Sequence, residues 1–427
     1  MKLHLSNLGA IKHGEIELGD ITLFVGKPNT GKSTAMKALF YSLYCPGNLI
    51  KLKQDGFEVK DNLFLLRFTI DREATEENYK NLIRDVLPEG EFKLEPTNVL
   101  DFILTQKLSY EENYIPISLP SMYFSKKCND KDIKRLMSSF SNAIYRISVN
   151  GDEGEAIVRA GISDVKQTCL NDEETLSSLS TAFMETVQGR LNYQYCKGFN
   201  GFLREKGIDG ITYNHYSRSF LTLQNLILQI TKDLITYDKR IFNLIKPLLK
   251  GQIANVGGNL VYTEENKIIP WDCVSASTLE IVSFLLSVKE GNLVLYEEPE
   301  AHLHEELQLL MAIVLYALSS SNRIVISTHS QSILYTIAHL SMLKPTKEEL
   351  KNLFESIKVK DYEALVEAVE EANNKEVKVK VYHFTEGEVK DMNVDEAVKG
   401  MPGTIDVLEK EFKWFSSVHS KMMFKQG

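Results

Sequence analysis

The sequence lacks the features that mark a disulfide framework, a zinc-binding domain or a membrane protein. Its five cysteines are scattered and odd in number, and they include no Cys-x-x-Cys pair, so we expect reduced thiols and a cytoplasmic protein. The most apolar runs, such as Ile281–Val288, are far too short to span a bilayer. The amino-terminal segment alternates and carries charges, unlike a signal peptide. We also find no internal repeat and no low-complexity tract.

Positive charge is scarce as well. The chain has 49 Lys and Arg against 58 Asp and Glu, a net charge of −9, so any nucleic-acid contact would need a local basic patch. Two clusters qualify: Lys126, Lys127, Lys131, Lys134 and Arg135, and then Lys239, Arg240, Lys246 and Lys250. They could flank a nucleic-acid groove in a dimer. Because acids are interleaved with them, a solvated helix face is the preferred interpretation.

Strand-like and helical patterns alternate along the 427 residues, which predicts an α/β fold with room for two or three domains. Residues 126–251 differ, because proline is nearly absent and helical periodicity dominates. We interpret them as a helical insertion, an arm or lid, between an amino-terminal part (1–125) and a carboxy-terminal part (252–427).

Individual elements follow from hydrophobic periodicity. Strands are expected in two runs within residues 1–25, the second being Ile21–Val25, and over Phe64–Ile70, Ile115–Phe124, Leu293–Tyr296, Ile324–Ser327 and, at the periphery, Val377–Phe384. Residues Val256–Ile269 are strand-like around a Gly257–Gly258 turn. Helices are expected over Ser33–Tyr44, Glu76–Val86, Leu221–Leu249, Thr278–Val288, Glu305–Leu318 and Val407–Met423, and within Lys347–Asn373.

The stretch that follows Ile21–Val25 fits the pattern G-x-x-x-x-G-K-[ST] of a phosphate-binding loop, or P-loop. It consists of Gly26, Lys27, Pro28, Asn29, Thr30, Gly31, Lys32 and Ser33, with Thr34 next on the helix. Glycines permit the path that points backbone N–H groups at phosphates, and the helix N-terminus adds partial positive charge. We expect Lys32 to bind the β and γ phosphates and Ser33 to bind Mg²⁺. The other interpretation is a chance glycine-rich turn.

Two further apolar strands end in residues suited to phosphate chemistry. Leu293–Tyr296 runs into Glu297 and Glu298, which predicts a Mg²⁺ ligand at Glu297 and a general base at Glu298. Ile324–Ser327 runs toward His329, whose imidazole can contact a γ-phosphate. The spacing of 31 positions from Glu298 to His329 leaves room for one helical crossover between parallel strands. The competing interpretations are a solvated acidic loop and an exposed histidine.

Together these motifs resemble the ABC-type P-loop ATPases of the AAA family, in the group that contains RecF, SMC and OLD-like proteins. The segment EPEAHLH at Glu298–His304 is similar to the OLD-like form DEPEAHLH, and LSNLGAIKHGEIEL resembles the first hairpin of the group. The resemblance implies an ATPase head with a mixed sheet, ATP and Mg²⁺ as cofactors, and two subunits that sandwich ATP. It implies that Ser275 acts as a signature serine on the partner's ATP.

Some residues depart from the group's pattern. Glu297 replaces the usual aspartate, the signature glycine has become Ala276 or Ser277, and the Q-loop glutamine has only a weak candidate in Gln106. Alternatively, Ser277 is a plain helix N-cap with Glu280 as its capping-box partner. The P-loop also resembles that of small GTPases, but no Asn-Lys-x-Asp motif follows, so adenine is favoured.

The remaining features bear on the biological role. Val381–Glu388 superficially resembles the start of a Toprim nuclease, but no Asp-x-Asp follows, so we expect no nuclease domain. Tyr193, Tyr195, Phe199 and Phe202 are interpreted as core or partner surface. The expected function is an ATP-dependent dimerisation switch in DNA repair or in defence against mobile elements, with DNA and a separate effector protein as candidate partners. The alternative is a regulatory ATPase that binds protein only.

Overall fold

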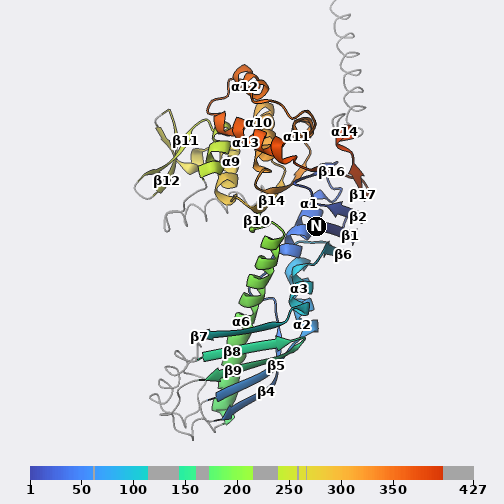
Figure 1. The fold of residues 1–427 in the computed structure, drawn as a ribbon, viewed down its shortest axis with the longest axis vertical. Helices are drawn as coiled ribbons and strands as arrows, with labels where there is room; N and C mark the ends of the chain where they lie inside the picture. The colour runs from blue at the N-terminus through green and yellow to red at the C-terminus, as the bar shows by residue number, and fades with distance from the viewer. Residues whose placement is uncertain are drawn as a thin grey trace, which may run out of the picture. The chain divides into compact units, whose positions relative to one another are not determined.

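The computed structural model describes residues 1–60, 63–113, 144–159, 173–214, 239–256, 259–265 and 267–397 (Figure 1). The chain forms two compact units. The first comprises Met1–Phe40, Leu87–Pro96 and Leu203–Gly427, and the second comprises Tyr41–Val86 and Thr97–Phe202. These limits differ from the predicted boundaries at residues 125 and 251, because the chain enters the second unit twice.

A nine-stranded mixed sheet forms the centre of the first unit. In spatial order its strands are β10 (Gly210–Asn214), β14 (Asn292–Glu297), β15 (Arg323–Thr328), β3 (Ile21–Gly26), β16 (Val379–Phe384), β17 (Gly387–Met392), β2 (Ile11–Glu17), β1 (Lys2–Leu8) and β6 (Glu91–Glu95). The first five strands are mutually parallel. The predicted α/β fold with a mixed sheet is therefore confirmed. Residues 1–25 hold three strands where two were predicted.

Burial explains why the central strands read as continuous apolar runs. Every residue of β3 and β14 is buried, as is all of β15 except Arg323, because helices cover them. The helices of this unit are α1 (Lys32–Leu43), α8 (Lys239–Ile245), α9 (Ala276–Ser287), α10 (Glu305–Leu318), α11 (Gln331–Leu343), α12 (Lys347–Ser356), α13 (Glu363–Lys375) and α14 (Val394–Ala397). Residues from α8 to α13 share one apolar core with β3, β14 and β15.

Smaller elements complete the first unit. They are the 3-10 turns η2 (Lys246–Leu248) and η3 (Trp271–Cys273) and a three-stranded sheet of β11 (Gln252–Val256), β12 (Asn259–Glu264) and β13 (Lys267–Ile269). The predicted peripheral strand near Val377 is β16, which pairs directly with β3. Its place in the middle of the sheet was not predicted, because long-range pairing is not visible in a local pattern. The helix expected over Val407–Met423 lies outside the described residues.

The second unit packs an antiparallel sheet against a long helix. Its strands, in spatial order, are β4 (Leu52–Lys60), β5 (Leu63–Ile70), β9 (Glu153–Arg159), β8 (Ile144–Asn150) and β7 (Leu108–Asn113). Its helices are α2 (Arg72–Arg84), α3 (Val99–Thr105) and most of α6 (Glu173–Glu205). The segment 126–251, predicted to be a helical insertion, thus contains the strands β8 and β9 as well as the long helix α6. These strands form a hairpin closed by Gly151 at φ +68° and Asp152.

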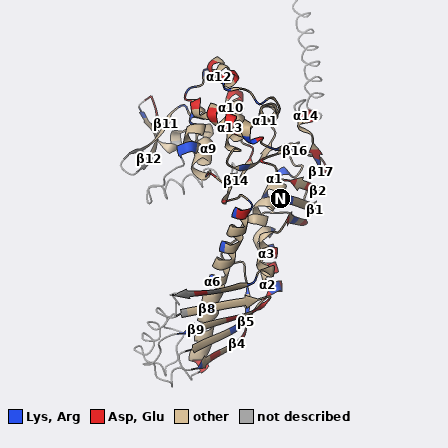
Figure 2. Ribbon diagram, viewed as in Figure 1, with Lys and Arg blue, Asp and Glu red and all other residues tan. Residues whose placement is uncertain are grey.

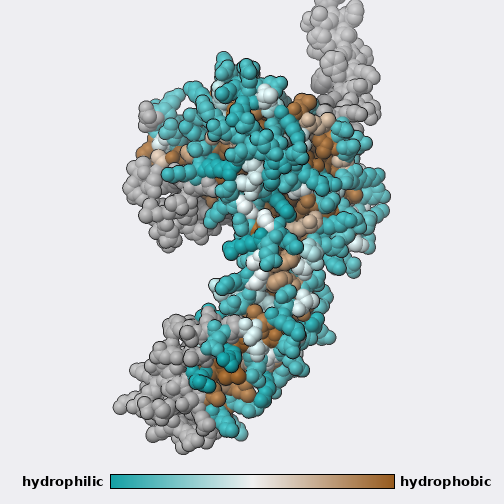
Figure 3. Space-filling model, in the orientation of Figure 1, coloured by the Kyte–Doolittle hydropathy of each residue, from teal (hydrophilic) through white to brown (hydrophobic). Residues whose placement is uncertain are grey.

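Aromatic side chains hold α6 in the second unit. Phe183 stacks on Phe64 with ring centroids 5.4 Å apart, and Phe199 packs against Phe102 at 5.2 Å. Tyr195 and Phe199 are buried and Tyr193 is exposed, so the predicted aromatic cluster is mostly core. On the sheet, Arg67 pairs with Glu58 and Arg146 with Glu111 across neighbouring strands. Figure 2 marks the Lys, Arg, Asp and Glu residues of the described chain in colour. The visible surface is mainly hydrophilic, with smaller hydrophobic patches (Figure 3).

Two cysteines of the second unit contradict the expectation of reduced thiols. Cys45 and Cys196 form a disulfide across a sequence separation of 151 residues. Sequence spacing could not reveal this pair, because α6 brings Cys196 back to the segment after α1. Cys273 is a free, exposed thiol.

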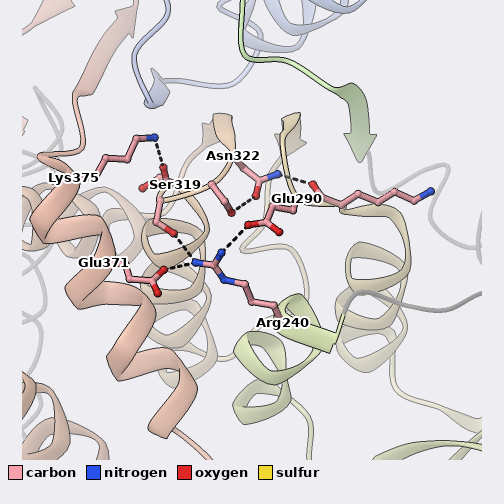
Figure 4. A network of polar contacts seen from close by, with 9 residues as sticks. Arg240, Glu290, Ser319, Asn322, Glu371 and Lys375 are labelled. Atoms are coloured by element: carbon pink, nitrogen blue, oxygen red, sulfur yellow. Dashed lines mark hydrogen bonds and ion pairs between the residues drawn. The ribbon is translucent and has the colours of Figure 1, made fainter. Parts of the chain in front are cut away.

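The amino-terminal ends of the parallel strands are held by a polar network in the first unit (Figure 4). The Arg240 guanidinium of α8 pairs with Glu290, 2.7 Å away, and with Glu371 of α13. Asn322 donates to the carbonyl of Lys289 at 2.7 Å. Lys246 pairs with Asp361 at 3.0 Å. Two members of the second basic cluster, Arg240 and Lys246, are thus paired with acidic residues of the same unit. The first cluster lies outside the described residues.

Candidate nucleotide site

The P-loop crosses from β3 to α1 with a backbone that its glycines make possible. Gly26 has φ +135° and Gly31 has φ +101°. A Cβ on Gly26 would lie 2.3 Å from the carbonyl oxygen of Phe384, and one on Gly31 would lie 2.5 Å from Ile11. Asn29 also has positive φ, at 63°, which asparagine tolerates better than most residues. The two motif glycines are therefore required by the local geometry.

Lys32 is folded back onto its own loop. Its ammonium donates to the carbonyl of Gly26 at 2.9 Å and to that of Lys27 at 2.8 Å. The Thr30 hydroxyl donates to the same Lys27 carbonyl at 2.8 Å. Burial lowers the pKa of Lys32 to about 8, although Glu298 and Glu300 oppose the shift. Phosphate oxygens could replace these carbonyl acceptors and restore full charge to the amine.

The other P-loop residues lie where the motif requires. Lys27, Pro28 and Asn29 are exposed at the tip, whereas Thr30 is buried. Ser33 and Thr34 stand in the first turn of α1, immediately after Lys32. Unpaired N–H groups of a first helical turn attract anions, so the start of α1 suits a phosphate.

The carboxyl ends of β14 and β15 bring Glu298 and His329 to the same edge as the P-loop. Glu297 pairs in register with Ser327, and Thr328 pairs with Val25 of β3. Glu298 Oε1 lies 3.4 Å from His329 Nε2, and the Glu298 N–H donates to the Ser327 carbonyl at 2.8 Å. The predicted convergence of the two strand ends is therefore present in the structure.

Backbone strain and desolvation mark this edge. Glu298 has φ +48°, in the left-handed region that non-glycine residues seldom adopt and that is often found at functional sites. Burial lowers the pKa of His329, and the charge of Lys32 lowers it further, while Glu298 raises it. A lowered pKa favours the neutral imidazole, which still has one N–H that can donate to a carboxylate or a phosphate oxygen.

Sequence reasoning did not assign a role to Glu300. Its Oε1 accepts from the backbone N–H groups of His329 at 2.5 Å and Ser330 at 3.1 Å, so it positions the start of α11. Burial raises its pKa. Glu300 lies within the EPEAHLH segment, and this segment is the sequence feature from which its role could have been predicted.

Glu280 and Ser275 depart from the predicted capping box. Ser275, rather than Ser277, is the N-cap of α9, and its hydroxyl accepts from the Thr278 N–H at 3.2 Å. Glu280 is only 2% exposed and its carboxyl makes no hydrogen bond within the described residues. Burial raises its pKa to about 8. Ser275 is exposed, and no hydrogen bond joins it to the P-loop of its own chain in the part described.

Ser33 and Glu297 offer oxygen ligands that fit Mg²⁺. Glu297 is 3% exposed, and the adjacent Ser327 hydroxyl is buried without a hydrogen-bond partner among the described residues. A polar edge with an unsatisfied hydroxyl suits a hydrated cation. No group of three or more His, Cys, Asp or Glu forms a metal cage in the described ranges, so phosphates and water would have to supply the other ligands.

Gln106, the weak Q-loop candidate, lies elsewhere in the fold. It is the C-cap residue of α3 in the second unit, whereas the P-loop belongs to the first. In the first unit, the strand next to β14 is β10, which ends at Tyr213 and Asn214. The Tyr213 hydroxyl donates a hydrogen bond to Glu297 Oε1. Tyr213 was not predicted, since it precedes Glu297 by 84 residues and no motif surrounds it.

Comparisons with known proteins identify the family of this chain. Residues 1–334 match the model of the AAA ATPase domain family. No curated protein matches the chain significantly.

Similar solved structures include three SMC head structures. An SMC head bound to the C-winged helix domain of ScpA has 12% identity and a TM-score of 0.37, covering 93% of this chain and 98% of its own. The SMC head of Thermotoga maritima has 8% identity and a TM-score of 0.33, with 92% and 97% covered. A Pyrococcus furiosus SMC head with an extended coiled coil, bound to the C-terminal domain of ScpA, has 10% identity and a TM-score of 0.32, with 96% and 98% covered.

No helix within the described residues is both long and apolar enough to cross a membrane.

Proposed function

The chain belongs to the AAA ATPase domain family, and from that premise we propose that it binds ATP at Gly26–Thr34 and hydrolyses it with Glu298 as general base. The observation that carries the proposal is the convergence of three groups at one sheet edge. Lys32 lies under the P-loop, and Glu298 faces His329 at 3.4 Å. A lysine can hold the phosphates, a carboxylate can accept the proton of the attacking water, and an imidazole can contact the γ-phosphate.

Each residue has a defined role in this scheme. Lys32 leaves its carbonyl partners to bind the β and γ phosphates. Glu298 accepts the proton of the attacking water, and His329 contacts the γ-phosphate. Ser33 and Glu297 would hold Mg²⁺, which neutralises part of the phosphate charge when it is bound.

Binding and turnover of ATP test the proposal directly. Lys32→Ala should abolish binding of a fluorescent ATP analogue, and Glu298→Gln should retain binding but lower kcat by about 10²–10⁴-fold. Tyr316→Phe, which alters α10 away from this edge, is the matched control. Hydrolysis that persists in Lys32→Ala would exclude this site as its source.

The site also supports a switch between monomer and dimer. Ser275 lies exposed at the N-terminus of α9, a position from which a helix can donate N–H groups to an anion. We place it on the γ-phosphate of a partner subunit, so that ATP joins two copies and hydrolysis releases them. Light scattering of Glu298→Gln should show a dimer with ATP and a monomer with ADP. A monomer in both states would contradict the sandwich.

The biological setting has two candidates. One is an OLD-like, DNA-associated ATPase in repair or in defence against mobile elements, with or without a separate effector protein. The other is a regulatory ATPase that binds only protein. The pairing of Arg240 and Lys246 with acids supports the second, because paired cations are less available to phosphates. DNA that neither shifts in a gel at low salt nor stimulates turnover would favour the regulatory role.

A further inference from the structure

Tyr213 is placed to touch the acid that the proposed function assigns to Mg²⁺. Strand β10 runs parallel to β14, with Tyr213 opposite Leu295. Side chains two residues apart on a strand share a face, so Glu297 lies on the same side of the sheet as Leu295 and Tyr213. The Tyr213 hydroxyl donates to Glu297 Oε1.

The ring of Tyr213 has a second neighbour. It stacks on Phe40 of α1, with centroids 5.2 Å apart and an interplanar angle of 26°. Helix α1 also carries Ser33, the other proposed Mg²⁺ ligand. The same tyrosine thus contacts the helix that presents the serine and the strand that presents the glutamate.

A glutamate in this position needs such support more than an aspartate would. Its side chain has one more rotatable bond, so its carboxylate can occupy more positions. Glu297 is also 3% exposed, and a buried carboxylate is unfavourable unless hydrogen bonds satisfy it. The phenol supplies one such bond and restricts the carboxylate to one orientation.

We propose that Tyr213 is a positioning residue that holds Oε1 of Glu297 and thereby orients the carboxylate for Mg²⁺ binding with Ser33. The inference rests on the proposed ATPase site and explains how glutamate can serve where related ATPases have aspartate. Partners that orient a metal ligand are known to influence metal affinity by about 10–100-fold.

Tyr213→Phe tests the proposal, because it removes the hydroxyl and keeps the ring that stacks on Phe40. A fluorescent ATP analogue is titrated in EDTA and then against Mg²⁺. We expect the Mg²⁺ concentration for half-maximal effect to rise about tenfold or more. Affinity without Mg²⁺ should stay within about twofold, because the P-loop is unchanged. Tyr316→Phe is the matched control, since its hydroxyl donates to Asn373 at 3.0 Å elsewhere in the same unit.

A double-mutant cycle with Glu297→Asp provides a second test of the contact between Tyr213 and Glu297. Glu297→Asp shortens the carboxylate and should lose the bond to Tyr213. The double variant should then resemble Glu297→Asp alone, whereas fully additive effects would overturn the proposal. Wild-type binding with an unaltered Mg²⁺ response in Tyr213→Phe overturns only the role of Tyr213. A wild-type chain that binds no ATP overturns the proposed function and the inference together.

Discussion

Raising the pH from 7 to 9 should weaken ATP binding by about tenfold through Lys32. Burial lowers the pKa of this amine to about 8. About nine-tenths of the molecules then carry the ammonium at pH 7 and about one-tenth at pH 9. A triphosphate binds the charged form, so binding at pH 9 requires uptake of a proton. The cost is about 1.3 kcal/mol, equivalent to the tenfold loss of affinity.

The sign follows from the direction of the shift. A lysine whose pKa is lowered to about 8 loses its charge as the pH rises through this value. Below pH 7 it is already charged, so its charge changes little as the pH falls further. Titration of His329 does not contribute to the change in affinity between pH 7 and 9, because its pKa is lowered and lies below this range. Glu280 titrates in the same range, since its pKa is raised to about 8.

The assay is equilibrium binding of a fluorescent ATP analogue at saturating Mg²⁺, with two variants as controls. Lys32→Arg keeps its charge at every pH used, so its affinity should not depend on pH, whatever its absolute value. Glu280→Gln removes the competing titration and should keep the full slope. The reasoning is refuted if wild-type affinity changes by less than about twofold, or if Lys32→Arg shows the same slope.

Three further predictions follow from local geometry. Gly31→Ala should abolish nucleotide binding in the same fluorescence titration, because the added Cβ would lie 2.5 Å from Ile11 on a backbone of φ +101°. Binding equal to wild type would show that the P-loop backbone does not require glycine at this position. Ser275→Ala should lower stability to urea by about 1 kcal/mol through loss of the N-cap, whereas Ser275→Asp should keep the cap and yet prevent the ATP-dependent dimer by repelling phosphate. In denaturant, Cys45 and Cys196 should react with iodoacetamide only after reduction, whereas Cys273 should react without prior reduction. Peptide mass spectrometry measures both outcomes. Reduction should cost about 2–4 kcal/mol of stability, and equal labelling of all three cysteines before reduction would exclude the bond.

Local patterns predicted the features that depend on neighbouring residues. The P-loop was recognisable because Gly26 and Gly31 are imposed by a turn within one short segment. Helix α10 begins and ends at the predicted residues, Glu305 and Leu318, because its apolar periodicity is long and continuous. The convergence of Glu298 and His329 followed from a general rule, that carboxyl ends of parallel strands meet at one edge.

Features that depend on long-range pairing could not be predicted in the same way. The alternation in Val377–Phe384 indicated a strand, but its partner β3 lies over 350 residues earlier in the chain. The choice between Ser275 and Ser277 as N-cap depends on backbone angles, and Ser275 is extended at φ −62° and ψ 149°. Tyr213 has no motif, because its importance comes only from the pairing of β10 with β14.

The reactive groups of the site form hydrogen bonds and ion pairs within the protein, and this affects which nucleotide can bind. Lys32 donates to two P-loop carbonyls, and Glu298 faces His329. A ligand must replace these contacts with better ones before it gains affinity. The β and γ phosphates can offer charged acceptors to Lys32, and the γ-phosphate alone can separate Glu298 from His329. A diphosphate therefore leaves the Glu298–His329 pair intact, and discrimination between ATP and ADP should depend on that pair more than on the P-loop.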